Sequence, residues 1–278
     1  MHLSLADNQY DSQPLQNDRR IKVLAHQYQI WRKHWGRDLD PKHQNEKRWI
    51  ALVGLAKRDR ESPNEVFNEL VALRLGQIIG LPIPAGLSIE NKGKIYFVSC
   101  GLLTTGEELP EADLEKFAKD EARLACGIVT FDAWIGNVDR HDENIWYDYY
   151  GHKTAVFDHG QSLLGPFGHE CLDNNESALT VKTGEYGLGS FVNSMVDFPH
   201  WYDRICAIPD STIKSTCTEA SAVGVGETLA KKCASWLINR KETLPQLFKD
   251  NKEKLPNLQS TLFDPFGNIN DFYPEYII

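Results

Sequence analysis

Two patterns of apolar residues alternate in the first part of the chain. Residues 48–57 are apolar over most of their length and are followed by charged residues, which predicts a buried strand. Residues 63–79 repeat apolar positions at helical spacing, with Ile78 in the apolar stripe, and Gly80 then predicts the end of a helix. Two short runs, 86–90 and 94–99, are separated by turn-forming residues and predict a hairpin.

The second part of the chain begins with a longer helical pattern. Apolar residues at helical spacing predict one helix from Pro110 to Ile135, closed by Gly136. A polar segment follows, and after it residues 145–149 and 154–157 predict a second hairpin. From residue 161 onward the pattern is mainly helical and carries no evident chemical motif.

Composition and charge limit the class of protein. The chain has 278 residues, of which 41% are hydrophobic and 25% charged, as in soluble globular proteins. No apolar run reaches the ~20 residues that a membrane-spanning helix needs, and the polar N-terminus lacks the layout of a secretory signal, so we expect a cytoplasmic protein. A net charge of −9 argues against direct nucleic-acid binding through a positive field.

The six cysteines are scattered without a Cys-x-x-Cys pair. In a chain of this size that spacing indicates reduced thiols within the structure and neither a disulfide framework nor a zinc site. Candidate chemistry must therefore come from other residues.

The polar segment between the predicted helix and the second hairpin reads Asn-Val-Asp-Arg-His-Asp-Glu-Asn, residues 137–144. Asp139 and Asn144 lie five residues apart in it, and Asp158 ends the second arm of a hairpin whose first arm starts at Asn144. Pairing of the arms brings Asn144 and Asp158 side by side. An amide oxygen and a carboxylate suit a hard dication such as Mg²⁺, and Asp139 is then available to orient a hydroxyl.

This division of roles matches phosphoryl transfer. In that reaction an Asp accepts the proton of the substrate hydroxyl, and an Asn five residues later with a later Asp-x-Gly hold the metal. A strand lysine held by a helix glutamate neutralises the nucleotide phosphates, and Lys57 with Glu69 fits that pair. Taken singly, each of these residues can also be interpreted as an ordinary turn or surface residue.

Two further groups of residues complete the candidate site. We expect Arg140 and His141 to hold the loop so that Asp139 stays aimed, and we keep His141 among the candidate catalytic residues. Three residues around the end of the first hairpin are candidates to bind adenine through their backbone groups: Val98, Cys100 and Leu102. The alternative is that this segment is an ordinary loop.

The segment Gly136-Asn-Val-Asp-Arg-His-Asp-Glu-Asn144, together with Asp158-His-Gly160, resembles the HipA-like kinase family. That family shares the Asn-x-Asp-Arg-His-x-x-Asn loop with relatives of the phosphoinositide kinases. The pair Asn68-Glu69 and the segment Gly80-Leu-Pro82 resemble its small lobe. The resemblance covers roughly residues 46–250 and is most specific over 136–160.

The resemblance implies a two-lobed protein-kinase-like fold, α+β, with a small β-rich N-lobe that has one helix and a larger, mainly helical C-lobe. Residues 1–45 would be a polar extension, 46–105 the N-lobe and 106–278 the C-lobe. It also implies ATP and Mg²⁺ as cofactors and transfer of phosphate to Ser or Thr of a protein substrate. The resemblance further implies a toxin–antitoxin setting, with an antitoxin-type or other regulatory protein as a partner.

Two other functions fit the residues. A small-molecule or lipid kinase would use the same chemistry on a different acceptor, although the acidic chain has no evident basic face for a membrane. A non-catalytic module that binds nucleotide or a partner protein would retain only the fold. The positions for metal and base carry competent residues, which makes the non-catalytic module the least favoured of the three functions.

Overall fold

The computed structural model of the chain describes residues 29–31, 54–58, 63–100, 111–165 and 187–250. It contains two compact units. The first unit comprises Met1–Lys57 and Val98–Leu109, and the second comprises Arg58–Phe97 and Pro110–Ile278. Among the described residues, small sheets combine with several helices, so the predicted mixture of α and β structure is confirmed.

The first unit is built on a strand pair. Strand β1 (Gln29–Trp31) runs antiparallel to β2 (Gly54–Lys57), with Gln29 opposite Ala56. Strand β4 (Lys94–Cys100), whose last residues belong to this unit, follows β2 in the sheet order β1-β2-β4-β3. A Cβ on Gly54 would lie 2.6 Å from Val98 Cγ1, so glycine permits this close approach. The predicted strand 48–57 is seen only from residue 54, since its first part lies outside the described residues.

In the second unit, helix α2 (Asn64–Ile79) and the first hairpin follow the sequence prediction. Gly80 ends the helix in the left-handed conformation at φ 88°. Strands β3 (Gly86–Asn91) and β4 are joined by Lys92 and Gly93, which both have positive φ, as a two-residue hairpin turn requires. Ile78 is 43% exposed, and its assignment to the buried stripe was wrong, because the helix buries the side that carries Ile79.

The predicted helix 110–135 is in fact two helices. Asp113 caps α3 (Leu114–Asp120) by accepting from Lys116 N at 3.0 Å. Glu121 then leaves the helical conformation, and α4 (Ala122–Ile135) begins. The carboxylate of Glu121 accepts from the hydroxyl of Tyr147 at 3.2 Å, a contact with a distant hairpin that no helical periodicity can reveal.

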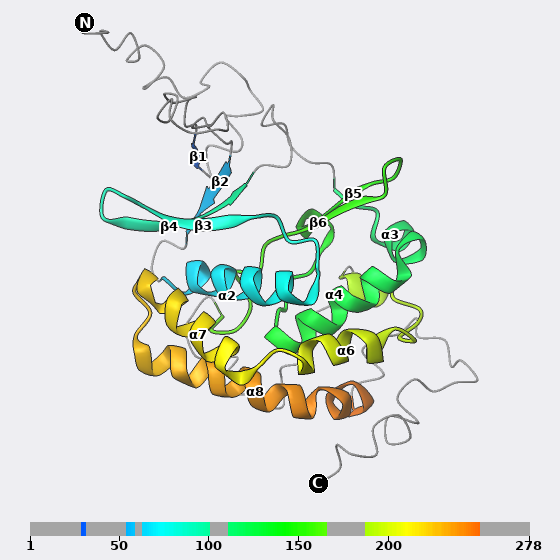
Figure 1. The fold of residues 1–278 in the computed structure, drawn as a ribbon. Helices are drawn as coiled ribbons and strands as arrows, with labels where there is room; N and C mark the ends of the chain where they lie inside the picture. Colours follow the sequence, from blue (N-terminus) through cyan, green and yellow to red (C-terminus); the bar gives the residue numbers. More distant parts are fainter. Residues whose placement is uncertain (1–28, 32–53, 59–62, 101–110, 166–186, 251–278) are drawn as a thin grey trace, which may run out of the picture. The chain divides into compact units, whose positions relative to one another are not determined.

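The second predicted hairpin is confirmed as β5 (Ile145–Asp148) and β6 (Lys153–Val156), with Ile145 opposite Val156. The described part of the last block is helical, as predicted, with neighbouring helices side by side in Figure 1. Its helices are α6 (Phe198–Cys206), α7 (Asp210–Ala220) and α8 (Glu227–Asp250).

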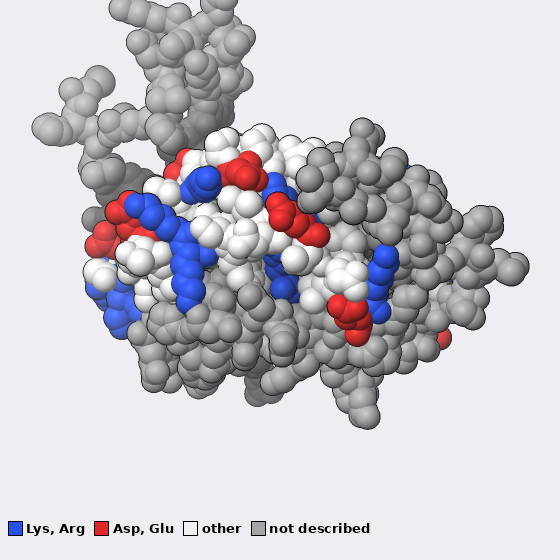
Figure 2. Space-filling model, turned by 90° about the horizontal axis from the view of Figure 1, so that it is seen from below, with Lys and Arg blue, Asp and Glu red and all other residues white. Residues whose placement is uncertain are grey.

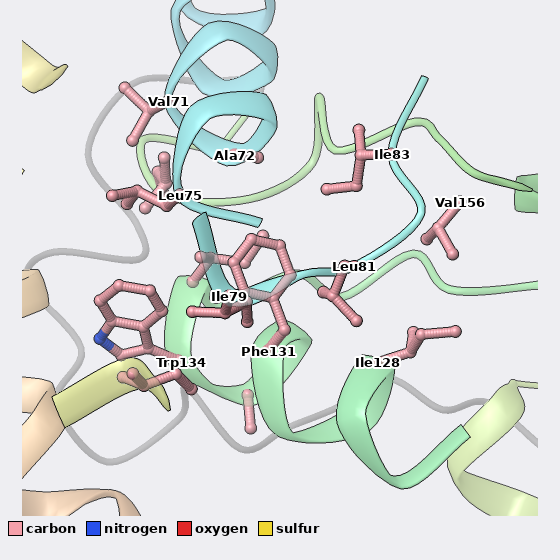
Figure 3. Close-up of a cluster of buried hydrophobic side chains, with 14 of the residues drawn as sticks. Val71, Ala72, Leu75, Ile79, Leu81, Ile83, Ile128, Phe131, Trp134 and Val156 are labelled. Atoms are coloured by element: carbon pink, nitrogen blue, oxygen red, sulfur yellow. The ribbon is translucent and has the colours of Figure 1, made fainter. Parts of the chain in front are cut away.

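The core of the second unit lies where α2 faces α4 (Figure 3). Its members are buried aliphatic and aromatic side chains of both helices and of the segments beside them: Val71, Leu75, Ile79, Leu81, Ile83, Ile128, Phe131, Trp134 and Val156. A Cβ on Gly76 would lie 3.2 Å from Phe131, so a residue without a side chain lets the two helices approach. Close packing of this kind makes the two helices a rigid support for the polar side chains that they carry.

Among the helices that the described ranges contain, none is both long and apolar enough to cross a bilayer.

Candidate active site

Asn144 and the residue before Asp158 meet at the base of the hairpin β5–β6. The short turn η2 (Asp142–Asn144) leads directly into β5, and Phe157 N donates to Asn144 O at 3.2 Å. The expected juxtaposition of Asn144 with the end of the second arm is therefore present in the backbone. Asp158 adopts a left-handed conformation at φ 58°, which turns the chain away from the strand.

Asp139 is held through its backbone. The side-chain amide of Asn144 donates to Asp139 O at 2.6 Å, and Asn137 Oδ1 accepts from Asp139 N at 3.2 Å. The side chain of Asp139 is 46% exposed, so it is open to a molecule in solution. A fixed backbone with an accessible carboxylate is the arrangement that a general base needs.

A buried ion pair lies beneath this loop. Arg140 donates through Nε to Asp132 Oδ2 at 2.9 Å and through Nη2 to Asp132 Oδ1 at 3.0 Å, with both side chains at most 3% exposed. Its third nitrogen, Nη1, donates to the carbonyls of Asn144 at 3.0 Å and Phe157 at 2.6 Å. The expected contact between Arg140 and the loop backbone is thus present and extends to the hairpin.

Two consecutive residues of α2 contact the turn that follows Asp158. Asn68 Nδ2 donates to Gly160 O at 2.7 Å, and Asn68 Oδ1 accepts from Leu164 N at 3.2 Å. Glu69 Oε1 accepts from His159 N at 2.8 Å. A Cβ on Gly160 would lie 2.8 Å from Glu65 Cγ, so the helix approaches the turn closely.

The two histidines of the site differ in environment. His141 lies between carboxylates, with Nε2 3.9 Å from Asp139 Oδ1 and Nδ1 3.4 Å from Asp142 Oδ1. His159 is fully buried, and neither ring nitrogen has a hydrogen-bond partner among the described residues. Its Nδ1 lies 3.6 Å from Glu69 Oε2, and its ring stands edge-on to Phe131.

Asn144 and Asp158 offer donors that fit a hard cation. The amide nitrogen of Asn144 is engaged with Asp139 O, which leaves the amide oxygen as the ligand atom. With the carboxylate of Asp158 it would supply an all-oxygen set of the kind that Mg²⁺ takes, usually together with water and phosphate. The part of the chain that the structure describes holds no group of three or more His, Cys, Asp or Glu suited to a metal, so a softer, protein-only site is not found there.

The predicted site residues divide between the two units. Asp139, His141, Asn144, Asp158 and Glu69 belong to the second unit. Hydrogen bonds join Asp139, His141 and Asn144 to one another, and Glu69 accepts from the backbone of His159, the residue after Asp158. The candidates of the first unit are Lys57, Val98 and Cys100. The roles of the residues in the two units, and the pairing of Lys57 with Glu69, stay predictions. Leu102 lies outside the described residues.

Sequence reasoning missed Asp132 and gave no role to Asn137. Asp132 is a carboxylate inside a mostly apolar helix, and a buried charge in such a position needs a partner. Asn137 follows Gly136 directly and donates to Asp132 Oδ1 at 2.8 Å. The signal that could have identified Asp132 is a charged residue that interrupts the apolar pattern of a helix.

Comparison with known proteins supports the fold alone. No protein-family model and no curated protein sequence matches the chain. Among solved structures, the chain is similar to the crystal structure of a Helicobacter pylori proinflammatory kinase, CtkA, with a TM-score of 0.52 and 16% sequence identity. The match covers 78% of this chain and 96% of that one. The chain therefore has a kinase-like fold.

Proposed function

We propose that the chain is an ATP- and Mg²⁺-dependent phosphotransferase of the HipA-like type that phosphorylates Ser or Thr of a protein. The observation that carries the proposal is the connection of Asp139, Asn144 and the end of β6 within one hydrogen-bonded unit. The kinase-like fold supports it independently of the motif. The proposed lobes are residues 46–105 and 106–278, after a polar extension of residues 1–45.

In the proposed reaction Asp139 accepts the proton of the acceptor hydroxyl. The acceptor oxygen forms a bond to the γ-phosphorus of ATP, the bond from that phosphorus to the β,γ-bridging oxygen breaks, and ADP leaves. Asn144 and Asp158 would hold Mg²⁺, which when bound neutralises charge on the phosphates. Lys57, held by Glu69, would bind the phosphates, and Val98, Cys100 and Leu102 would bind adenine.

The accessible carboxylate of Asp139 could serve a protein acceptor or a small-molecule acceptor equally well. The choice of a protein acceptor therefore rests on the resemblance. A regulatory protein partner of the antitoxin type is proposed on the same ground. Direct nucleic-acid binding is not expected at a net charge of −9. On the face shown in Figure 2, basic and acidic side chains of the described residues lie among one another.

The test is phosphate transfer from γ-labelled ATP in the presence of Mg²⁺, with the purified chain alone and with a cell lysate. Asp139→Asn should lower transfer to protein by about 10²–10⁴-fold while binding of an ATP analogue stays nearly unchanged. Asp148→Asn is the matched control, because Asp148 lies at the far end of the same hairpin, where it accepts from Tyr150 N, a role that an amide oxygen can keep.

Equal transfer by the Asp139→Asn variant would overturn the assignment of the base. Label found only in small molecules or lipids would replace the protein kinase by a kinase of that acceptor class. ATP binding without any transfer would favour the non-catalytic nucleotide-binding module.

A further inference from the structure

The carboxylate of Asp132, on helix α4, is the point from which the backbones of the candidate residues are held. It is 2% exposed and accepts three hydrogen bonds, two from Arg140 and one from Asn137 Nδ2. A buried carboxylate is tolerated when each oxygen is paired, and here both oxygens are. Removing the carboxylate therefore affects two different partners.

The first partner, Arg140, connects Asp132 to the hairpin. Its Nη1 donates to Asn144 O and to Phe157 O. Asn144 is one proposed metal ligand, and Phe157 directly precedes Asp158, the other. A planar guanidinium with two nitrogens bound to one carboxylate has its third nitrogen fixed in direction. The spacing between the two arms at their base is thereby tied to Asp132.

The second partner, Asn137, connects Asp132 to the proposed base. Asn137 Nδ2 donates to Asp132 Oδ1, and its Oδ1 accepts from Asp139 N. Asn137 N also donates to Asp132 O at 2.9 Å. This path reaches Asp139 without passing through the hairpin.

We infer that Asp132 is a positioning residue, which sets the metal ligands Asn144 and Asp158 through Arg140 and the base Asp139 through Asn137. The inference rests on the proposed function, since it assigns a purpose to the ion pair only if these residues bind metal and accept a proton. It predicts separable effects of the two paths. Loss of the Arg140 path weakens metal binding, whereas loss of the Asn137 path lowers turnover.

The test uses Mn²⁺ as the probe ion, titrated into the full chain with a non-hydrolysable ATP analogue and followed by electron paramagnetic resonance. Arg140→Lys keeps a charge for Asp132 but has no planar fork to reach both carbonyls, and it should weaken Mn²⁺ binding by about 10–100-fold. Asp132→Asn should weaken it similarly. Asn137→Ser should leave Mn²⁺ affinity near that of the natural chain and lower kcat with little change in KM.

The matched control is Lys241→Met. Lys241 is a buried cation in the same unit that donates to Ile208 O at 3.0 Å and to Asp210 Oδ1 at 2.8 Å, neither of which is a candidate site residue. It should lower the melting temperature as Arg140→Lys does and leave Mn²⁺ affinity unchanged. A role of Asp132 in stability alone would give all of these variants the same Mn²⁺ affinity.

The outcomes separate the two claims. If the natural chain binds Mn²⁺ with the nucleotide and transfers phosphate, while Asp132→Asn and Arg140→Lys bind it equally well, the positioning role is overturned and the proposed function stands. An equal loss of affinity in Lys241→Met also overturns the positioning role. If the natural chain binds no Mn²⁺ with nucleotide, both claims fall. Should Asp132→Asn not fold, Arg140→Lys carries the test.

Discussion

The backbone N–H of His159 donates to Glu69 Oε1 at 2.8 Å. A helix side chain thus holds the residue directly after Asp158, the proposed metal ligand. Because Asp158 is itself in a left-handed conformation, the turn depends on such external contacts to persist. The position of α2 and the conformation of the turn are therefore linked.

Two substitutions of Glu69 separate its contact with the turn from its proposed pairing with Lys57. Glu69→Gln keeps an oxygen that accepts from His159 N but removes the charge, whereas Glu69→Ala removes both. We expect Glu69→Ala to lower the free energy of unfolding by about 1–3 kcal/mol and Glu69→Gln to lower it much less, measured by urea denaturation. If Glu69 also holds Lys57, as proposed, the Gln variant will weaken ATP binding. Equal stability of both variants and the natural chain would contradict the contact with the turn.

Asn68 is expected to matter more for stability than for chemistry. It is fully buried, and its amide satisfies both Gly160 O and Leu164 N. Asn68→Ala leaves a buried acceptor and a buried donor without partners, which should lower the free energy of unfolding by about 2–4 kcal/mol. Arg74→Ala, at an exposed position of the same helix, should change it by less than about 0.5 kcal/mol. Similar values for the two variants would show that the turn finds other partners.

The elements that local sequence predicts best are those fixed by their own residues. Lys92 and Gly93 form the hairpin turn, and Gly80 ends α2, because these conformations depend on the residue type at one position. The hairpin 145–157 follows from its alternating pattern. The motif likewise placed Asn144 at the base of that hairpin, because hairpin pairing is local.

What the sequence could not reveal depends on contacts between distant residues. Asn68 binds Gly160, 92 positions away, and Leu164, 96 positions away. The break at Glu121 accompanies contacts to Tyr147 and His152. Periodicity registers which residues are apolar but not which polar residue will meet another across the fold, so these contacts needed coordinates.

Gly136 is expected to be sensitive to substitution for a backbone reason. It ends α4 at φ 66°, where a side chain is strained, and a Cβ there would lie 3.1 Å from the ring of Trp236. Gly136→Ala should lower the free energy of unfolding by about 1–2 kcal/mol. Gly226→Ala is the control, because Gly226 has no positive φ and no atom within 4 Å of its Cβ position. Equal melting temperatures for the two variants would contradict this explanation.

Tyr147 gives the chain a dependence of stability on alkaline pH. Its side chain is buried, and its hydroxyl lies within hydrogen-bond distance of Glu121 Oε1 and, at 2.9 Å, of His152 Nδ1. Burial, with the hydrogen bond to Glu121 as a second cause, raises the pKa of Tyr147 from 10.0 to about 12. The folded state therefore keeps this proton at a pH where the unfolded state has lost it.

The sign of the effect follows from that difference. Stability from Tyr147 is fully present below pH 10 and is lost as the pH rises from 10 toward 12, because the unfolded state releases its proton first. Urea midpoints measured between pH 9 and pH 11 should thus fall more steeply for the natural chain than for Tyr147→Phe, which has no phenol to titrate. Tyr150→Phe, at a side chain that is 99% exposed, should follow the natural chain. Parallel curves for the natural chain and Tyr147→Phe would mean that the hydroxyl ionises equally in both states, and the contact with Glu121 would then have no energetic consequence.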